Sequence, residues 1–401
     1  TESYVGANLY GRYLNHGNLQ IMASGKPISN FSSGFNQKGW DWNHFPGTTA
    51  TVLPLKELRA DIKNLDAESG YEEMLLSDEA FAGGISLRNS NGAYAMKLHE
   101  HDKYNGSLRA RKSYFFFDNR IVALGSGVQS ALSGKEVHTT LFQVYQSSDV
   151  HPIQINGEEQ TAFPFETKLT AKATELSDGL NNYFFVKNAS VDVKKTLQRS
   201  FDEETDAPTK NPFALAYINH GEKAKDNRYE YLVLVQPDAA GLKSARKELK
   251  SNKLYTVLQQ DSLAHIVYDI TTKTTAYVFF EAGKPVKANE VVSVDKPCLV
   301  MTENISGEQM AISVCDPDLH FYEGASDDQY DQNGQRIERS IYSRAWINNP
   351  SAISTIEVVL KGNWKTKENS EYIQVKNVSN EMTVLTVKCQ HGMSRELLLV
   401  K

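Results

Sequence analysis

The stretch S-Y-F-F-F-D-N-R-I-V-A-L, residues 113–124, decides the fold class. Two runs rich in aromatic and aliphatic residues flank Asp118-Asn119, which predicts a β-hairpin with strands over residues 113–117 and 120–124 and a two-residue turn. The phenylalanines at 115–117 are expected in a core rather than on a binding surface. The chain around this hairpin is therefore expected to form antiparallel strands.

Short strands of the same kind recur along the chain without strand–helix alternation. Only residues 239–250 are expected to be helical, because Leu242, Ala245 and Leu249 share one face while lysines and an arginine occupy the others. Strands are predicted at residues 141–145, 183–186, 229–235, 265–270, 276–280, 298–302, 310–315, 355–360, 372–375, 382–387 and 396–400. This organisation predicts an all-β protein with large packed antiparallel sheets.

A change in composition suggests where the chain divides. The stretch A-G-K-P-V-K-A-N-E-V-V at residues 282–292 contains Gly, Pro and Lys, and a new set of strands follows it. The sequence therefore predicts a large β-sandwich over residues 1–290 and a small C-terminal β-sandwich over residues 291–401.

Charge and composition exclude several classes of protein. A net charge of −6 gives no general attraction to polyanions, so nucleic-acid binding is not expected and an acidic polymer would need a local basic groove. No run of 18 apolar residues is present, so no membrane span is expected. Cys298, Cys315 and Cys389 have no metal-site spacing and are expected to be buried thiols, with one bridge at most.

The first fifty residues hold the candidate functional groups. A carboxylate, Glu2, is followed by tyrosines, Asn8, Arg12 and His16, and then by G-W-D-W-N-H-F-P-G-T-T at residues 39–49. Aromatic rings and hydrogen-bonding side chains punctuated by glycine are typical of a groove that binds sugars. The first residue is Thr rather than Met, which indicates a cut product.

These motifs form an ordered series that resembles the chondroitin sulfate ABC lyases of polysaccharide lyase family 8, in the β-rich part that follows their helical toroid. The series covers nearly the whole chain and consists of Glu2-x-Tyr4, Asn8-x-Tyr10-Gly11-Arg12-Tyr13, Gly39-Trp40-Asp41-Trp42-Asn43, Pro46-Gly47, Leu53-Pro54-Leu55-Lys56, Phe81-Ala82-Gly83-Gly84, Thr139-Thr140-Leu141-Phe142-Gln143, Tyr229-Glu230-Tyr231 and Asp316-Pro317-Asp318-Leu319. The resemblance implies that the large sandwich is a supersandwich of the galactose-mutarotase-like type.

The resemblance also implies a reaction and a partner. Lyases of this family cleave chondroitin and dermatan sulfate by β-elimination at the uronic acid, which leaves a 4,5-unsaturated sugar. The proton-transferring His and Tyr and a charge-neutralising Arg lie on the toroid, and a supporting Glu comes from the start of the β-rich part. That residue corresponds to Glu2, which is expected to accept hydrogen bonds from an Arg or Tyr and orient it. A solvated chain end is the alternative for Glu2. The isolated chain is expected to be inactive without the toroid.

Five other residues are candidates for substrate contact. Trp40 and Trp42 could stack on sugar rings or anchor the sandwich core, and the two interpretations stay open. Asn43 and His44 are expected to contact hydroxyl or sulfate oxygens. Arg12 could bind a sulfate or carboxylate, although a structural ion pair explains it equally well.

Other charged stretches are interpreted as surface. The basic residues within 109–112 are expected to line the solvated face of a strand, and the acids within 202–206 to form a solvated loop rather than a glycosidase acid pair. The sequence Asp331-x-Asn333-Gly334 lacks the ligand spacing of a calcium-binding helix-loop-helix, so no cofactor is expected to be required, with looser calcium binding left open.

The resemblance implies a periplasmic or secreted bacterial enzyme with a sulfated glycosaminoglycan as its partner. Two alternatives remain on sequence grounds, because large β-sandwiches host many functions. One is a non-catalytic carbohydrate-binding or scaffold module, and the other is a glycoside hydrolase or mutarotase-like enzyme.

Overall fold

The computed structural model describes residues 9–22, 33–64, 71–73, 77–104, 106–148, 150–320, 331–334, 351–379 and 381–401. Within these residues the chain is built of antiparallel strands, with one α-helix, α1 (Ala239–Lys250), and two short 3₁₀ helices, η2 (Leu55–Leu58) and η3 (Asp102–Tyr104). In the part of the chain that the structure covers, no helix has the length and apolar character that crossing a membrane requires. The predicted all-β class is confirmed.

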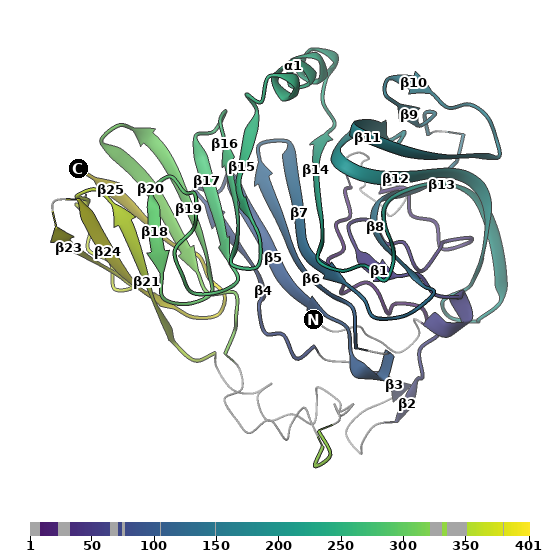
Figure 1. The fold of residues 1–401 in the computed structure, drawn as a ribbon, viewed down its shortest axis with the longest axis horizontal. Helices are drawn as coiled ribbons and strands as arrows, with labels where there is room; N and C mark the ends of the chain where they lie inside the picture. The colour runs from purple at the N-terminus through teal and green to yellow at the C-terminus, as the bar shows by residue number, and fades with distance from the viewer. Residues whose placement is uncertain are drawn as a thin grey trace.

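A twelve-stranded sheet forms the larger half of the molecule (Figure 1). Its main path runs through β1 (Thr49–Thr51), β8 (Glu136–Tyr145), β13 (Pro208–Glu222), β12 (Asn182–Phe201), β14 (Asn227–Val235), β7 (Arg120–Gln129), β6 (Arg109–Phe117), β5 (Asn91–His99) and β4 (Ala82–Leu87). Off this path, β11 (Phe165–Ser177) pairs with β12, β9 (Gln154–Ile155) pairs with β11, and β10 (Glu158–Glu159) pairs with β9. A separate pair, β2 (Lys63–Asn64) and β3 (Tyr71–Glu72), lies outside this sheet.

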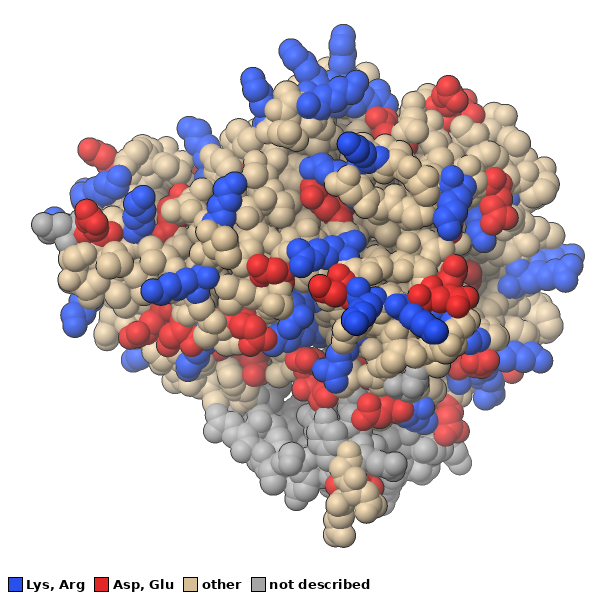
Figure 2. All heavy atoms as spheres, viewed as in Figure 1, with Lys and Arg blue, Asp and Glu red and all other residues tan. Residues whose placement is uncertain are grey.

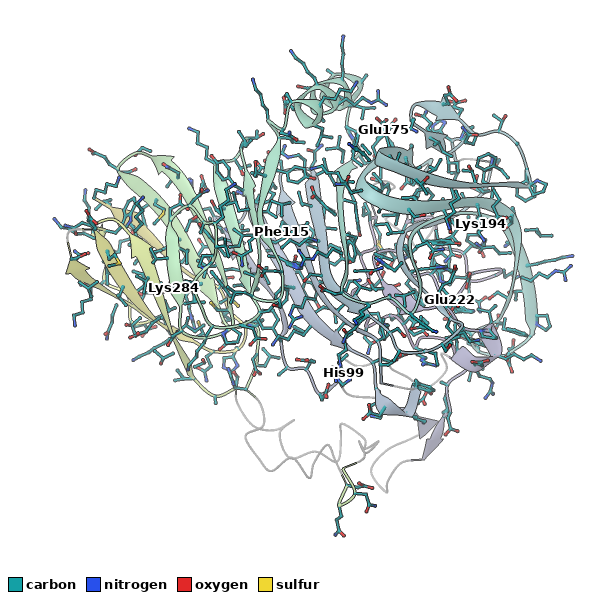
Figure 3. The ribbon with its side chains drawn as sticks, in the orientation of Figure 1. His99, Phe115, Glu175, Lys194, Glu222 and Lys284 are labelled. Atoms are coloured by element: carbon teal, nitrogen blue, oxygen red, sulfur yellow. The ribbon has the colours of Figure 1, made fainter. Side chains whose placement is uncertain are left out.

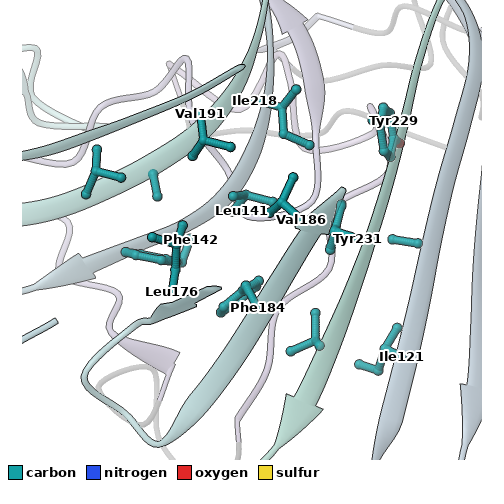
Figure 4. Close-up of a cluster of buried hydrophobic side chains, with 14 of the residues drawn as sticks. Ile121, Leu141, Phe142, Leu176, Phe184, Val186, Val191, Ile218, Tyr229 and Tyr231 are labelled. Carbon is teal, nitrogen blue, oxygen red and sulfur yellow. The ribbon is translucent and has the colours of Figure 1, made fainter. Parts of the chain in front are cut away.

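The predicted hairpin lies inside this sheet, between β14 and β5. Strands β6 and β7 pair antiparallel, with Phe117 opposite Arg120 and a left-handed Asp118 in the turn, as the aromatic stretch predicted. The large sheet curls, because Tyr114 of β6 and Phe142 of β8 belong to one apolar cluster although their strands are far apart in the sheet order. Figure 4 shows part of this cluster, in which Phe142, Phe184, Val186 and Tyr231 converge.

Two smaller sheets follow, of which the seven-stranded sheet packs on the large sheet and the four-stranded sheet packs on the seven-stranded one. The seven-stranded sheet runs through β15 (Tyr255–Gln260), β16 (Ala264–Asp269), β17 (Thr274–Phe279), β19 (Cys298–Ser306), β20 (Gln309–Cys315), β25 (Arg395–Val400) and β22 (Lys365–Thr366). The four-stranded sheet runs through β18 (Val291–Val294), β21 (Ser354–Lys361), β24 (Met382–Cys389) and β23 (Ile373–Ser379).

The seven-stranded sheet is buried on both faces, and its side chains alternate between two cores. Ala276 and Val278 of β17 pack with Phe115 toward the large sheet, whereas Tyr277 and Phe279 pack toward the four-stranded sheet. Figure 3 labels Phe115 where the hairpin meets this middle layer. The described residues therefore form three stacked layers. Successive side chains of a strand point to opposite faces of its sheet, so a sheet that is covered on both faces contributes side chains to two cores.

The expected division near residue 290 falls inside this middle layer. Strands β15 to β17 precede that position and strands β19, β20 and β25 follow it, yet all pair in one sheet. The Gly-, Pro- and Lys-containing stretch is the connection between β17 and β18, and the change from the large sheet to the middle sheet comes earlier, across α1.

Helix α1 matches the predicted range at both ends. Asp238 caps its N-terminus by accepting a hydrogen bond from the Gly241 backbone N–H, and Leu242 and Ala245 bury its apolar face. In the view of Figure 2, basic side chains gather over α1, while acidic and basic side chains are interspersed over the sheets. Cys298, Cys315 and Cys389 are buried free thiols, as expected.

Candidate functional site

Residues 9–22 and 33–58, which contain no α-helix, form an N-terminal segment that is fixed to the large sheet by a buried lysine. Lys112 lies on β6 between Ala110 and Tyr114, on the face that points away from the middle layer, and its side chain is fully buried. Its Nζ donates to the backbone oxygens of His16, at 2.9 Å, and Gly47, at 2.6 Å, and to Thr49 Oγ1, at 3.0 Å. Three acceptors match the three N–H bonds of an ammonium group, although burial lowers the pKa of Lys112.

The expectation that the basic residues within 109–112 are solvated is wrong for Lys112. Arg109 is exposed and Arg111 half-buried, but the side chain of Lys112 lies on the opposite face of the strand, inside the protein. Its acceptors come from residues more than sixty positions away in the sequence. The lysine therefore links two parts of the N-terminal segment to strand β6 of the large sheet.

Tyr114 supports the same junction two residues further along β6. Its hydroxyl oxygen lies 2.7 Å from Gly17 O and 2.8 Å from Gly47 O. Gly47 has φ +81°, and a Cβ there would lie 2.7 Å from both the backbone N and the Cβ of Leu19. Glycine is thus required at this turn both by its backbone conformation and by the close approach of the neighbouring chain.

The loop that carries the predicted substrate contacts is held by its own side chains. Asn43 donates from Nδ2 to Leu53 O at 3.0 Å and accepts at Oδ1 from Leu53 N at 2.9 Å. Asp41 Oδ1 accepts from the Asn43 backbone N–H at 3.0 Å. The amide of Asn43 therefore closes the loop onto residue 53, and its predicted contact with substrate stays a prediction.

His44 belongs to a chain of four titratable groups. Its Nδ1 lies 2.8 Å from Asp41 Oδ2 and its Nε2 lies 3.0 Å from His138 Nδ1, while His138 Nε2 lies 2.9 Å from Glu136 Oε2. Each ring nitrogen of the two imidazoles therefore has a partner within this chain of groups. Both rings are buried, whereas Asp41 and Glu136 keep part of their surface in solvent.

The surroundings set where the charges of this chain lie. Burial alone would raise the pKa of Asp41, but the His44 charge and hydrogen bonds from His44 and Asn43 lower it to about 2. Burial, followed by repulsion from His44 and His220, lowers the pKa of His138 to about 2. These directions favour an ionised Asp41 and a neutral His138 ring.

Tyr217 covers the two imidazoles. Its ring stacks on His138 with centroids 4.0 Å apart and on His44 at 5.0 Å. Lys194, labelled in Figure 3, lies 5.9 Å from the centre of the same tyrosine ring and pairs with Glu166 at 2.9 Å. The predicted contact of His44 with sulfate stays a prediction, since both ring nitrogens already have partners inside the chain.

The tryptophans lie in an aromatic core beside this loop. Trp40 and Trp42 are each 1% exposed, and Trp42 Nε1 donates to Phe201 O at 2.9 Å. Phe45, Phe213 and Tyr10 surround them with ring centroids about 6 Å away. Their burial gives them the role of core anchors, one of the two interpretations left open by the sequence, and their contact with sugar stays a prediction.

Edges of this aromatic core line a pocket of about 150 Å³. The rings of Phe35, Trp40, Trp42 and Phe45 line it together with the polar side chains of Asn18, Gln20 and Glu203, among other residues. Glu203 belongs to the acidic run 202–206, which was expected to be solvated, yet its side chain is half-buried. Burial, together with the charges of Glu204 and Asp202, raises the pKa of Glu203.

Arg12 forms the ion pair that was one of its two expected roles. Its Nη2 lies 2.8 Å from Glu100 Oε1 with both side chains less than a tenth exposed, and the guanidinium carbon lies 3.6 Å from the centre of the Tyr104 ring. Burial raises the pKa of Glu100, and the Arg12 charge opposes that shift. The predicted binding of a substrate anion by Arg12 stays a prediction.

The structure tests neither the expected role of Glu2 nor the expectation that no cofactor is required. Glu2 lies outside the described residues, so its catalytic role stays a prediction. Among the described residues, no group of three or more His, Cys, Asp or Glu side chains could hold a metal ion.

Sequence reasoning missed Lys112, His138, Asn18 and Glu203 as parts of this region. The burial of Lys112 and the pairing of His138 with His44 depend on contacts across the fold. Asn18 and Glu203 are separated by nearly half the chain before they meet at one pocket. The sequence held one local signal that Lys112 is buried, because this residue falls on the same strand face as Ala110 and Tyr114.

The profile of the polysaccharide lyase family 8 super-sandwich domain matches residues 1–246, and that of the family's C-terminal β-sandwich domain matches residues 256–319. The chain is 39% identical to a chondroitin sulfate ABC exolyase of Bacteroides thetaiotaomicron, over 100% of this chain and 38% of the relative. It is also 39% identical to a chondroitin sulfate ABC exolyase of Proteus vulgaris, over 91% of this chain and 35% of the relative. The chain thus spans little more than a third of the length of these relatives.

Solved structures share the fold. A Paenibacillus xanthan lyase superimposes with a TM-score of 0.70 at 18% identity and covers 100% of this chain and 34% of its own. A chondroitinase AC lyase studied with bound oligosaccharides superimposes with a TM-score of 0.67 at 21% identity, over 99% of this chain and 49% of its own. At these identities the likeness concerns the arrangement of the sheets alone.

Proposed function

Because this chain belongs to polysaccharide lyase family 8, we propose that it is the β-rich portion of an enzyme that cleaves chondroitin and dermatan sulfate. The observation that supports this substrate class is the 39% identity to chondroitin sulfate ABC exolyases along the entire chain. The proposed partner within the enzyme is a helical toroid, whose side chains would face the N-terminal segment across a cleft.

The proposed reaction is β-elimination at the uronic acid. A base removes the C5 proton, the C4–O bond breaks, and the departing oxygen receives a proton, which leaves a 4,5-unsaturated uronate without addition of water. Negative charge that builds on the uronate carboxyl group during proton removal must be met by positioned donors. These donors and the proton-transferring groups are proposed to lie on the helical portion.

In this division of labour, the β-rich portion acts as a rigid platform. Lys112 and Tyr114 hold the segment around residues 16–17 and 47 against the large sheet. The proposed role of Glu2, fourteen residues before His16, is to accept hydrogen bonds from an Arg or Tyr of the helical portion. A fixed platform keeps such a carboxylate within the narrow geometry that catalysis requires.

The products of the full-length enzyme test the reaction class. Digestion of chondroitin sulfate and of dermatan sulfate should give oligosaccharides with the ultraviolet absorbance of an unsaturated uronate and a mass one water below that of the hydrolysis product. Products of hydrolytic mass would support a glycoside hydrolase instead. Saturable binding without any cleavage would support a carbohydrate-binding module.

The role of Glu2 is tested by Glu2→Gln in the full-length enzyme. Loss of the carboxylate charge should lower kcat by about tenfold to a hundredfold, with a smaller change in KM, because an orienting group acts mainly in the transition state. The exposed Glu57→Gln variant serves as the control. An unchanged kcat and an unchanged pH profile of kcat for Glu2→Gln would remove Glu2 from the active centre.

We also propose that elimination needs no cofactor and that the enzyme is periplasmic or secreted, where a polymeric substrate is accessible. Turnover should then survive treatment with a metal chelator, while loss of activity that calcium restores would contradict the first point. Fractionation of the native bacterium checks the second point.

A further inference from the structure

Helix α1 carries a concentration of positive charge that no step of the proposed reaction uses. Residues 239–253 contain five basic side chains and one acidic one, in a chain whose net charge is −6. Figure 2 shows basic side chains gathered over this helix, whereas basic and acidic side chains are interspersed over the sheets in the same view. The helix is therefore a local exception to the overall charge of the chain.

Three of the lysines form one row along the helix. Lys243, Lys247 and Lys250 are spaced i, i+4 and i+7, which places them on one side of α1 over about 10 Å. All three are exposed, whereas Leu242 and Ala245 are buried. Among the residues that the structure describes, none of the three lysines has an acidic partner within ion-pair distance. These three residues are called the lysine row below.

The other charged side chains of the helix have partners within the protein. Arg246 binds the carboxylate of Glu175 on β11 through Nε and Nη2, and its guanidinium carbon lies 6.0 Å from the centre of the Tyr183 ring. Figure 3 labels Glu175 near α1. The one acid of the helix, Glu248, accepts a hydrogen bond from Ser244 Oγ at 2.9 Å. These contacts fix the helix and leave the lysine row as its exposed charge.

Helix stability alone does not explain the lysine row. Cations near the C-terminal end of a helix interact favourably with its dipole, which accounts for Lys247 and Lys250 in the last turn. Lys243 lies before that turn, and like charges at i, i+4, such as those of Lys243 and Lys247, destabilise a helix. A ligand with repeated negative charges would offset this repulsion, whereas one small anion would reach only part of the row.

The chemistry of the helix distinguishes between classes of polyanion. Amphipathic helices that bind membranes bury an apolar face in the lipid, but Leu242 and Ala245 of α1 pack into the protein core. Binding of single-stranded nucleic acid relies on aromatic side chains that stack on the bases, and α1 contains no aromatic residue. A sulfated polysaccharide presents negative charges along its length, and the compact charges of a row of lysines match them.

The lysine row lies on a different side of the large sheet from the attachment of the N-terminal segment. Leu242 and Ala245 belong to the apolar cluster between the large sheet and the middle layer, together with Phe115 and Phe117 of β6. The N-terminal segment binds Lys112 on the opposite face of the same strand. A polymer on the lysine row would therefore be held outside the proposed active centre.

We propose that the lysine row of α1 is a second binding site for sulfated glycosaminoglycan, which retains a long polymer on the enzyme outside its active centre. The identity of the polymer rests on the proposed function. Such a site raises the local concentration of a long chain at the cleft, because the second contact of a bound chain is intramolecular. It does not help a short oligosaccharide, which cannot reach both sites.

Binding of size-defined chondroitin 4-sulfate to the 401-residue chain, measured by calorimetry at low salt, tests this site. The triple variant Lys243→Gln, Lys247→Gln, Lys250→Gln should weaken binding of a long polymer about tenfold, which three exposed charge pairs of ordinary strength together supply. The difference should shrink as salt is added, because salt screens exposed charges. Hyaluronan of equal length carries no sulfate and should bind the parent chain more weakly. Thermal unfolding checks that the variant is folded.

A matched control separates the lysine row from the loss of any three positive charges. Lys284, Lys287 and Lys361 are also exposed and lie outside α1. The triple variant Lys284→Gln, Lys287→Gln, Lys361→Gln changes the net charge equally and should alter polymer binding by less than about twofold. In the full-length enzyme, the α1 variant should raise KM for the long polymer and leave kcat and the turnover of a tetrasaccharide unchanged, since the row does not contact the reacting sugar.

Several outcomes would overturn the proposal. They are unchanged polymer binding in the folded α1 variant, an equal loss in the control variant, equal binding of hyaluronan, or binding through the lysine row to phosphatidylserine vesicles instead of the polysaccharide. Eliminase activity on the tetrasaccharide is measured separately. Polymer binding that depends on the row in an enzyme without eliminase activity would contradict the proposed function and keep the site, and the reverse pattern would contradict the site alone.

Discussion

Lys112 is the residue on which the attachment of the N-terminal segment depends most. Its three acceptors all belong to that segment or to the turn at Gly47, and the side chain is fully buried. A buried ammonium group costs free energy through desolvation, and the complete set of acceptors offsets that cost.

Lys112→Met should lower the free energy of unfolding by about 2–4 kcal/mol, because two carbonyl oxygens and a hydroxyl group would each lose one buried hydrogen bond from the ammonium group while the aliphatic volume is kept. Urea denaturation of the purified chain measures this effect. Lys168→Met on β11, where the lysine is exposed, is the control and should stay within about 0.5 kcal/mol of the parent. Similar losses for the two variants would mean that the three contacts of Lys112 are not stabilising.

The contacts of individual residues are what the sequence predicts least well. The types of the residues near Trp40 suggested a sugar-binding surface, but the burial of both tryptophans and the closed hydrogen bonds of Asn43 depend on packing partners such as Phe213 and Leu53. Arg12 had two expected roles, and Glu100, eighty-eight positions away, supplies the structural one. Such pairings arise from tertiary contacts, which one sequence does not reveal.

At the scale of elements, strands and turns were largely predictable. The range of α1 and the hairpin of β6 and β7 follow from local period and turn chemistry. Predicted strands lie within or next to observed ones, although β12 extends over twenty residues where only four were expected. Burial alternates along residues 182–186 and again along 191–195 of β12, but the alternation is interrupted between them, so one continuous strand does not show one continuous pattern.

The turn at Gly47 gives a test at this scale. Gly47→Ala combines a left-handed backbone with contact against the Leu19 backbone, so it should cost about 3 kcal/mol of stability. Gly134→Ala has φ +71° but nothing within 4 Å of the added Cβ, so it should cost only about 1 kcal/mol. Thermal or urea unfolding of both variants measures the two losses of unfolding free energy. Equal losses would show that the close approach at Gly47 does not contribute to the cost of the substitution.

At the scale of the whole molecule, three sheets stack into one structure with a shared middle layer. The sequence indicated antiparallel strands but did not predict several of them, such as β5 and β13, and the pairing of strands across residues 255–400 is long-range, which one sequence does not reveal. A loop rich in Gly, Pro and Lys marks a connection and does not by itself mark the end of a sheet.

The buried histidines predict how this assembly responds to acid. Burial, as the largest cause, lowers the pKa from 6.5 to about 3 for His16 and His265, to about 2 for His138 and to about 4 for His220. Each ring stays neutral in the folded state but takes up a proton on unfolding below pH 6.5. Stability is therefore complete above that pH and should fall as the pH drops, by about 1.4 kcal/mol per pH unit for each histidine.

Unfolding free energies measured by urea between pH 7 and pH 5 check this slope. His220→Gln can keep the hydrogen bond to Thr139 and should reduce the proton uptake by one. A pH-independent stability over this range, or an unchanged slope in His220→Gln, would contradict the assignment of neutral buried rings.

The most direct test of the central claim is an eliminase assay of the 401-residue chain on chondroitin sulfate, alone and mixed with the helical portion of a family 8 lyase. The account predicts no increase in unsaturated-uronate absorbance from the chain alone and a clear increase once the helical portion is supplied. Sustained turnover by the chain alone would contradict it, because the proton-transferring groups would then have to lie on the sheets described above.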